Sequence, residues 1–324
     1  MKLLQVKNLK TYFYIDKEEV PAVDGVDFEV NQGEVLALIG ESGSGKSVTS
    51  LSIMGLVDEP GKIISGEILL SREGIFEDDL IKKSDKQMRF LRGKEISMIY
   101  QDPLSSLHPM IKVGEQVAEA LMIHEKVTKS EAKRKAIEMM HRVGISDGET
   151  RYDEFPSQFS GGMQQRIMIA MAIICNPQLL IADEPTTALD VTIQAEILDL
   201  LRKLQKENGM SMMLITHDLG VVAEMADRVC VMYCGKIMEE TTNVRLFKNP
   251  KNPYTKGLMK CIPRIDDKLE YLDTIEGYVP HPTDFPEGCR FSTRCPEVME
   301  RCKEELPELK EVEPGHKVRC WLYE

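Results

Sequence analysis

The sequence has no hydrophobic run long enough to cross a lipid bilayer. Its longest apolar stretch, residues 167–175, is about half of the ~18–20 residues that a membrane-spanning helix needs. Polar residues also interrupt the first seven positions too early for the apolar core of a secretion signal. These absences predict a cytosolic chain.

Basic residues are fewer than acidic residues. The chain has 41 Lys and Arg against 53 Asp and Glu, a net charge of −12 at pH 7. Proteins dedicated to nucleic-acid binding carry a net basic face, so the composition argues against a nucleic-acid partner. There is no internal repeat and no low-complexity tract. A chain of 324 residues with 42% hydrophobic residues is typical of a globular protein of about two domains.

Short apolar runs alternate with amphipathic helical stretches, which predicts an α/β fold with a mainly parallel sheet. Residues 3–29 are expected to form short strands, with turns at Asp16-Lys17 and Asp24-Gly25. The apolar runs expected to be buried strands are 34–39, 178–182, 211–215 and 228–232, and helices are expected over 48–56 and 194–207.

Two segments break this alternation. Residues 114–157 are charged and helical in pattern, which predicts the core of an inserted helical subdomain at about 105–175. From about residue 250 onward proline, charge and cysteine rise together, which predicts a small irregular C-terminal appendage. The expected domains are therefore 1–249 and 250–324.

A phosphate-binding pattern follows the first apolar run. Residues 40–47 match G-x-x-x-x-G-K-[ST], in which glycines let successive backbone N–H groups point at an anion and a helix begins at once. Lys46 is expected to reach the β- and γ-phosphates of a nucleotide, and the Ser47 hydroxyl to ligate Mg²⁺. The candidate nucleotide-binding residues here are Gly40, Ser42, Gly43, Ser44, Gly45, Lys46, Ser47 and Val48.

Two acids follow the second apolar run. Asp183 and Glu184 stand at the carboxyl end of an expected buried strand, where ligands bind in open α/β sheets. Asp183 can hold Mg²⁺ through water, and Glu184 can polarise an attacking water. Adjacent acids alone are common turn residues. Together with the phosphate loop they favour a nucleotide-hydrolysing site.

These motifs resemble those of ATP-binding-cassette (ABC) ATPases over about residues 1–245. The family's Leu-Ser-Gly-Gly-Gln signature has a counterpart in Phe159-Ser160-Gly161-Gly162-Met163, with Phe for Leu and Met for Gln. The resemblance implies a P-loop cassette with an antiparallel β subdomain and a helical subdomain. It also implies that Ser160, Gly161 and Gly162 grip the γ-phosphate bound by a second subunit.

The resemblance assigns further roles by position. Glu184 is the implied catalytic base, Gln101 senses Mg²⁺ and the attacking water, and His217 contacts the γ-phosphate. Asp190, in Ala188-Leu189-Asp190, belongs to the loop that communicates across the dimer. Phe13 is the implied adenine-stacking aromatic, with Tyr12 and Tyr14 as alternatives.

One subfamily is especially similar. Residues 100–109, Tyr-Gln-Asp-Pro-Leu-Ser-Ser-Leu-His-Pro, and residues 249–255, Asn-Pro-Lys-Asn-Pro-Tyr-Thr, resemble stretches of dipeptide and oligopeptide importer ATPases, as do Leu258 and Ile262-Pro263. Val48, where Thr is the alternative, resembles the D-type subunit more than its F-type partner.

Eight cysteines fall into two groups. Cys175, Cys230, Cys234 and Cys261 lie in apolar or strand-like contexts and are expected to pack. Cys289, Cys295, Cys302 and Cys320 crowd into a segment with few apolar residues, which a metal could cross-link. Their spacing leaves an iron–sulfur cluster, Zn²⁺, and disulfides or no bond open. The importer subfamily has a similar cysteine pattern and some members hold a [4Fe–4S] cluster, so the resemblance implies that cluster in a structural role.

The resemblance implies ATP hydrolysis that powers import of di- or oligopeptides. The implied partners are a second ABC ATPase, an F-type paralogue or a second copy, two integral membrane permeases and, indirectly, a peptide-binding protein, with the chain peripheral on the cytoplasmic side of the membrane. Three alternatives stay open: an importer of nickel or another small solute, a soluble ABC ATPase acting on chromosomes or ribosomes, and a non-enzymatic metal or redox module.

Overall fold

A computed structural model describes residues 1–72, 75–187, 189–261 and 274–324. The described chain forms two compact units. The first unit contains Met1 with residues 31–34 and 82–214, and the second contains residues 2–30, 35–81 and 215–324. No helix in these described ranges is both long enough and apolar enough to span a membrane. The predicted boundary between residues 249 and 250 stays a prediction.

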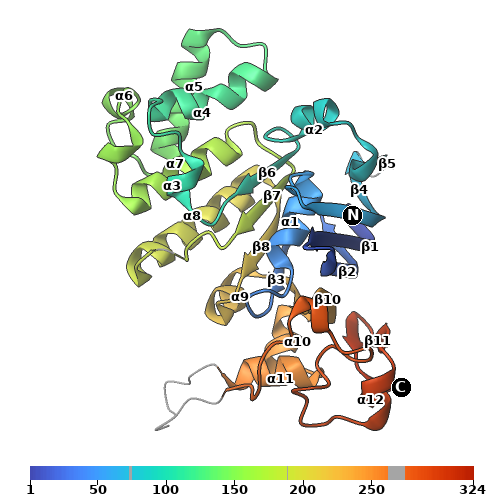
Figure 1. Ribbon diagram of the computed structural model, residues 1–324. Helices are drawn as coiled ribbons and strands as arrows, with labels where there is room; N and C mark the ends of the chain where they lie inside the picture. The colour runs from blue at the N-terminus through green and yellow to red at the C-terminus, as the bar shows by residue number, and fades with distance from the viewer. Residues whose placement is uncertain (73–74, 188, 262–273) are drawn as a thin grey trace. The chain divides into compact units, whose positions relative to one another are not determined.

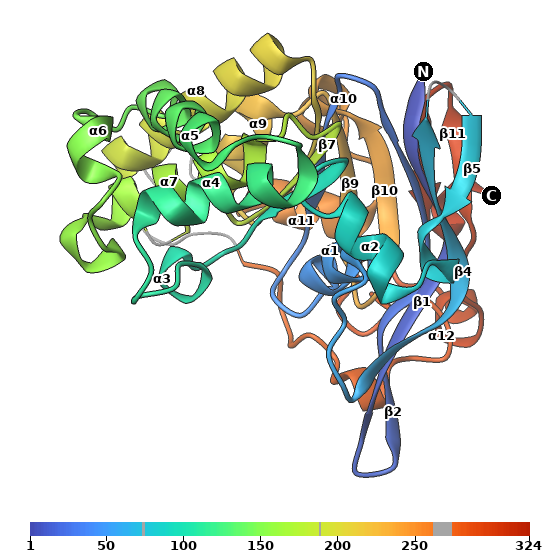
Figure 2. The same ribbon diagram turned by 90° about the horizontal axis from the view of Figure 1, so that it is seen from above.

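A four-stranded antiparallel sheet forms one layer of the second unit. Its order is β2-β1-β4-β5, with β1 and β4 side by side (Figure 2). The strands are β1 (Lys2–Ile15), β2 (Glu18–Asn31), β4 (Gly61–Arg72) and β5 (Ile75–Asp79). The antiparallel β subdomain implied by the resemblance to ABC ATPases is thus confirmed.

The two turns expected in residues 3–29 have different outcomes. Asp16 and Lys17, with φ of 50° and 72°, join β1 to β2, as a two-residue hairpin turn requires. The turn expected at Asp24-Gly25 is wrong, because β2 continues through both residues. Gly25 accommodates a φ of 73° within β2, so the strand does not end at this glycine.

The second unit also holds the strands β11-β12-β10-β9-β3, in that order. Their bounds are β3 (Val35–Ile39), β9 (Arg228–Tyr233), β10 (Lys236–Thr242), β11 (Leu309–Glu313) and β12 (His316–Arg319). β3 pairs with β9 in parallel, whereas the pairs formed by β9, β10, β11 and β12 are antiparallel. The helices of this unit are α1 (Lys46–Met54), α9 (Leu219–Met225), α10 (Asn243–Lys248), α11 (Pro253–Lys260) and α12 (Glu300–Glu304).

The irregular C-terminal appendage is not confirmed. β12 pairs with β10 and so extends the sheet that carries β3. At this junction His316 Nε2 and Glu239 Oε1 are 2.6 Å apart, and both side chains are fully buried. Tyr254 and Phe291, from the same C-terminal part, share a core cluster with Tyr233 of β9. Of the part after residue 250, the described strands β11 and β12 and the residues Tyr254 and Phe291 are therefore packed into the second unit.

The first unit is mostly helical. Its strands β6 (Ile96–Ile99) and β7 (Leu179–Asp183) are parallel, and β8 (Ser211–Thr216) carries the chain into the second unit. Figure 1 shows α4, α5, α6 and α7 grouped together. The helices are α2 (Asp85–Leu91), α3 (Pro103–Ser106), α4 (Val113–His124), α5 (Lys129–Arg142), α6 (Gly148–Arg151), α7 (Gly161–Ile173) and α8 (Val191–Asn208).

Candidate functional site

The phosphate loop of the second unit joins β3 to α1. A Cβ on Gly40 would lie 2.1 Å from the backbone oxygen of Met232, and one on Gly45 would lie 2.3 Å from that of Ala22. Both glycines also have positive φ, 154° and 100°. No residue with a side chain fits either position without backbone movement, so the local fold depends on these two glycines.

Lys46 begins α1 and points back into this loop. Its Nζ donates hydrogen bonds to the backbone oxygens of Gly40, at 2.8 Å, and Glu41, at 3.0 Å. The residue is 6% exposed. Gly45, the N-cap residue, offers no side chain to the first turn of α1. A buried ammonium group beside a helix N-terminus favours binding of an anion at this point.

Phe13 and His217 also belong to the second unit. Phe13 is half-buried near the end of β1, with its ring over Gly61, whose added Cβ would meet ring atom Cε1 at 2.7 Å. The alternatives differ in their surroundings: Tyr12 donates its hydroxyl to Asp24 at 2.9 Å, and Tyr14 is exposed. His217 is exposed in the turn between β8 and α9. The stacking role of Phe13 stays a prediction.

The acidic pair lies in the first unit, at the carboxyl end of β7. Asp183 is the last residue of the strand and is buried. Glu184 has a φ of 47°, and its Oε2 accepts hydrogen bonds from Gln101 Nε2 at 2.9 Å and Thr187 Oγ1 at 2.8 Å. The structure therefore joins Gln101 and Glu184, two residues that the sequence placed 83 positions apart. Thr187 was missed, and its position three residues after Glu184 was the only signal.

The signature residues begin α7 in the same unit. The hydroxyl of Ser160, the N-cap, accepts a hydrogen bond from the N–H of Met163 at 3.4 Å. A Cβ on Gly161 would meet nothing within 4 Å, whereas one on Gly162 would lie 2.8 Å from Ile193 in α8. An open, glycine-lined helix N-terminus can approach an anion closely.

Asp190 starts α8 in the same way. It is exposed, and its Oδ1 accepts a hydrogen bond from the N–H of Ile193 at 3.1 Å. Of the motifs named from the sequence, Ala188 and Ile262-Pro263 lie outside the described residues.

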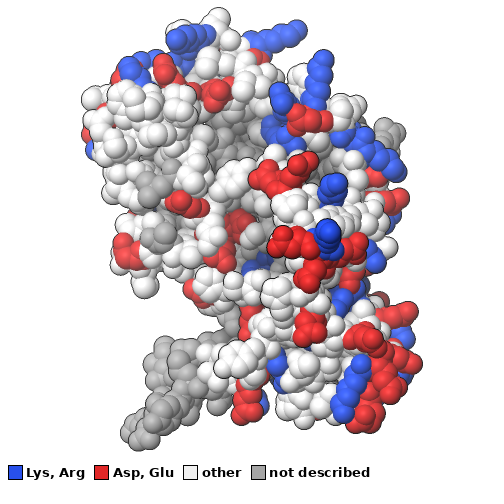
Figure 3. Space-filling model, in the orientation of Figure 1, with Lys and Arg blue, Asp and Glu red and all other residues white. Residues whose placement is uncertain are grey.

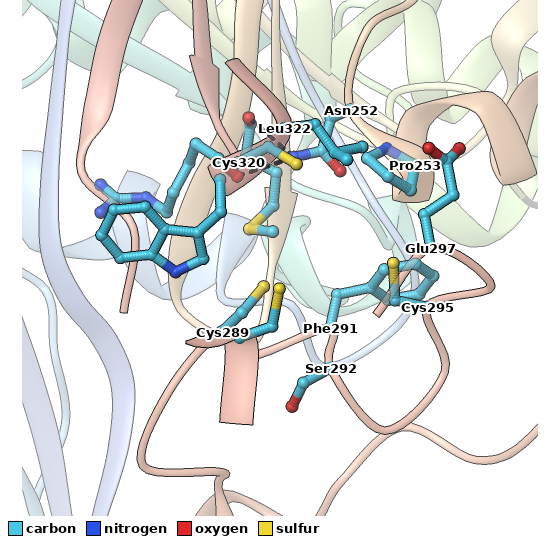
Figure 4. A pocket seen from close by; sticks show the side chains of 13 residues that line it. Asn252, Pro253, Cys289, Phe291, Ser292, Cys295, Glu297, Cys320 and Leu322 are labelled. Atoms are coloured by element: carbon cyan, nitrogen blue, oxygen red, sulfur yellow. Dashed lines mark hydrogen bonds between the residues drawn. The ribbon is translucent and has the colours of Figure 1, made fainter. Parts of the chain in front are cut away.

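The four C-terminal cysteines come together in one pocket of the second unit. Cys289, Cys295, Cys302 and Cys320 all line it, and none forms a disulfide. Figure 4 shows the sulfur atoms of Cys289, Cys295 and Cys320 around a common space. Met238, Phe291, Trp321 and Leu322 are among the other residues that line it. An added Cβ on Gly288 would lie 2.3 Å from the Cys302 oxygen, so the segment before Cys289 can pack closely against α12.

The chemistry of this donor set fits a thiolate-bound metal group. Burial, with a smaller contribution from the neighbouring cysteines, raises the pKa of the Cys289 and Cys320 thiols to about 11. Metal binding here would release protons, because thiolate is the ligand. Across the described ranges no three His, Cys, Asp or Glu are arranged to hold a single metal ion. The metal centre inferred from the cysteine spacing thus stays a prediction.

Acidic side chains are numerous on the surface of the C-terminal part of the chain. Figure 3 shows red side chains gathered over the C-terminal part of the chain. The exposed acids there include Glu300, Glu304, Glu305, Glu308 and Glu311. Several of these acids pair with exposed basic side chains, such as Glu300 with Lys303 and Glu305 with Arg301.

A buried strand, a glycine loop and a helix that starts with a buried lysine define a P-loop nucleotide-binding protein. The family model "ABC transporter" matches residues 23–187, and the model "Oligopeptide/dipeptide transporter, C-terminal region" matches residues 238–302.

Known peptide transport ATP-binding proteins match nearly the whole chain, and a solved cassette matches a shorter part of it. The oligopeptide transport ATP-binding protein AppD of Bacillus subtilis is 52% identical over 99% of this chain and 97% of its own. The dipeptide transport ATP-binding protein DppD of Haemophilus influenzae is 50% identical over 99% of this chain and 95% of its own. A dimeric structure of the ATP-binding cassette MJ0796 bound to ADP and Pi covers 74% of this chain and 99% of its own, with a TM-score of 0.66 and 27% identity. The chain belongs to the family of oligopeptide/dipeptide ABC transport ATP-binding proteins.

Proposed function

We propose that this protein is the ATP-binding and ATP-hydrolysing subunit that powers ABC-type import of di- or oligopeptides. The observation that carries the proposal is the match of both cassette and C-terminal region to peptide transporters, over one continuous chain. The buried Lys46 and the Glu184–Gln101 pair supply the chemistry that ATP hydrolysis needs.

ATP binds first through its phosphates. The backbone N–H groups of residues 43–48 and the Lys46 ammonium carry the β- and γ-phosphates, and the adenine stacks on Phe13. Ser47, Gln101 and Asp183 are the residues that would hold Mg²⁺, which offsets phosphate charge when bound. Ser47 supplies a hydroxyl and Asp183 a buried carboxylate, both suited to that hard cation.

Hydrolysis needs a positioned water. Glu184 accepts a proton from it, and Gln101 and Thr187 hold the Glu184 carboxylate by two hydrogen bonds to the same oxygen. His217 contacts the γ-phosphate. Ser160, Gly161, Gly162 and Asp190 serve the ATP bound by a second ATPase subunit, an F-type paralogue or another copy of this chain.

Two permease subunits and a peptide-binding protein complete the transporter, with this chain attached to the cytoplasmic face of the membrane. In cells that naturally express this protein, deleting its gene should abolish uptake of a radiolabelled dipeptide. Restoring the gene should restore uptake. Loss of nickel uptake instead would favour the nickel alternative. Normal uptake of both, with the chain co-purifying with ribosomes or DNA, would favour the soluble alternative.

We further propose that Cys289, Cys295, Cys302 and Cys320 hold a [4Fe–4S] cluster, with Zn²⁺ as the alternative. Four free thiols that line one pocket support this, since Cys₄ sets bind such clusters. The cluster would supply a cross-link to a segment with few apolar residues, a structural role.

Protein purified without oxygen should contain about four iron atoms per chain and absorb visible light. Changing all four cysteines to serine should remove the iron and lower the thermal unfolding temperature. Cys175→Ser, which alters a cysteine outside the pocket, is the matched control and should keep its iron. One zinc per chain would establish the alternative, and an absence of both metals would refute a metal centre.

A further inference from the structure

An arginine from the segment that contains the four C-terminal cysteines, residues 289–320, contacts the phosphate loop. Arg294, next to Cys295, has a side chain that is only 4% exposed. Its Nη1 donates to Glu41 Oε2 at 2.7 Å and its Nη2 donates to Glu41 Oε1 at 3.2 Å. Glu41 is the second residue of the loop that begins at Gly40. A two-pronged arginine–carboxylate contact fixes orientation as well as distance.

The remaining donors of Arg294 are also occupied. Nε donates to the backbone oxygen of Glu276 at 3.1 Å, Nη2 to that of Ile275 at 3.2 Å, and Nη1 to the Tyr233 hydroxyl at 3.3 Å. The guanidinium is therefore held by three groups other than Glu41. Such a group has little freedom left to lose when it fixes its partner.

The main chain of Glu41 is held as well. Its N–H donates to the Tyr254 hydroxyl at 3.0 Å, and its carbonyl oxygen accepts from Lys46 Nζ at 3.0 Å. Tyr254 packs on Tyr233 and Phe291, with ring centroids 4.6 and 5.3 Å away. Phe291 lies between Cys289 and Cys295 in the sequence and lines the cysteine pocket with them. The Glu41 side chain is thus held by Arg294, and its N–H is held by Tyr254, which packs on Phe291. Arg294 and Phe291 both lie between Cys289 and Cys295.

We propose that Arg294 is a positioning residue that holds the phosphate loop in its ATP-binding shape through Glu41. A glycine-rich loop has much conformational freedom to lose when it closes on phosphate. A partner that restricts the loop beforehand lowers that cost and tightens nucleotide binding. Because the chemical step depends on other residues, the effect falls on ATP affinity. The inference rests on the proposed binding of ATP at this loop.

The test compares Arg294→Gln and Arg294→Lys with the parent protein. Arg294→Gln should raise both the Kd and the KM for ATP about tenfold, with kcat changed by less than about twofold. Arg294→Lys keeps the positive charge but not the paired N–H donors, so it should lose less ATP affinity than Arg294→Gln. The matched control is Arg301→Gln, since Arg301 pairs with Glu305 and Glu324 at the surface of the same C-terminal part. It should leave ATP affinity unchanged.

A double-mutant cycle isolates the contact. Glu41→Gln should weaken ATP binding, and adding Arg294→Gln to it should weaken binding little further, because both changes break the same contact. Unchanged ATP affinity in folded Arg294→Gln, a loss confined to kcat, or additive effects of the two substitutions would each overturn the proposal. If Arg294→Gln fails to fold, Arg294→Lys and Glu41→Gln decide by the same criteria.

Failure of this inference and failure of the proposed function give different results. If Lys46→Ala binds ATP normally, the phosphate loop is not the nucleotide site and both ideas fall. If Lys46→Ala loses ATP while the Arg294 variants keep it, only the positioning role is refuted. A nucleotide-dependent rise in unfolding temperature, measured for each variant, reports binding independently of turnover.

Discussion

Glu184→Gln is expected to lower kcat for ATP hydrolysis by about a thousandfold and to leave ATP binding intact. The amide has the shape of the carboxylate but cannot accept the proton from the attacking water. In the structure the carboxylate is already aimed by Gln101, at 2.9 Å, and Thr187, at 2.8 Å. Phosphate release should therefore nearly stop, and ATP should hold two subunits together as a stable dimer. Phosphate assays and size-exclusion chromatography with ATP measure the two effects.

The matched control for this variant is Glu207→Gln. Glu207 is an exposed acid at the end of α8 that pairs with Arg142 at 3.2 Å. Its amide variant should turn over ATP normally. Normal turnover by Glu184→Gln would refute the assignment of Glu184 as the base, whatever the state of the dimer.

Lys46→Ala is expected to weaken ATP binding by at least about a hundredfold, with loss of hydrolysis. Each hydrogen bond to a charged group contributes roughly 1.5–3 kcal/mol, and this ammonium is expected to make more than one to the phosphates. In the structure, Lys46 donates to the backbone oxygens of Gly40 and Glu41, which places its ammonium group inside the loop. Titration with a fluorescent ATP analogue gives the Kd.

Lys7→Ala is the matched control, because Lys7 is an exposed lysine of β1 in the same unit, 3.7 Å from Glu67. It should bind ATP like the parent protein. Thermal unfolding without nucleotide separates a binding defect from a folding defect. If folded Lys46→Ala bound and cleaved ATP at parental rates, the nucleotide site would lie elsewhere.

Much of the site could be predicted because its residues lie close together in the sequence. The loop from Gly40 to Ser47 is one continuous segment, and Gly40, Gly43 and Gly45 all have the positive φ that favours glycine. The start of α7 was predicted for the same reason, since Ser160 caps it through a residue only three positions on. The helix expected over residues 194–207 begins earlier, at Val191, where Asp190 is the cap. Boundaries were less accurate. The helix expected from residue 48 begins at Lys46, because Gly45 is the N-cap residue of α1.

Longer contacts were not readable from one sequence. β12 joins β10 through Val318 and Glu239, 79 positions apart, so the segment predicted to be an appendage contributes strands to a sheet. Arg294 reaches Glu41 across 253 positions. In the sequence, Arg294 is one of many arginines, and only its place beside Cys295 distinguishes it.

The sequence alone determined the class of chemistry and predicted the residues proposed to perform it, since the phosphate loop, the acidic pair and the helix caps each form within a few neighbouring residues. The tertiary structure alone decided which distant groups hold those residues in place: Gln101 on Glu184, Arg294 and Tyr254 on Glu41, and four cysteines around one pocket. Local patterns reflect the geometry of short chain segments. Which distant segments meet depends on how the whole core packs, and that packing leaves no mark at any single position.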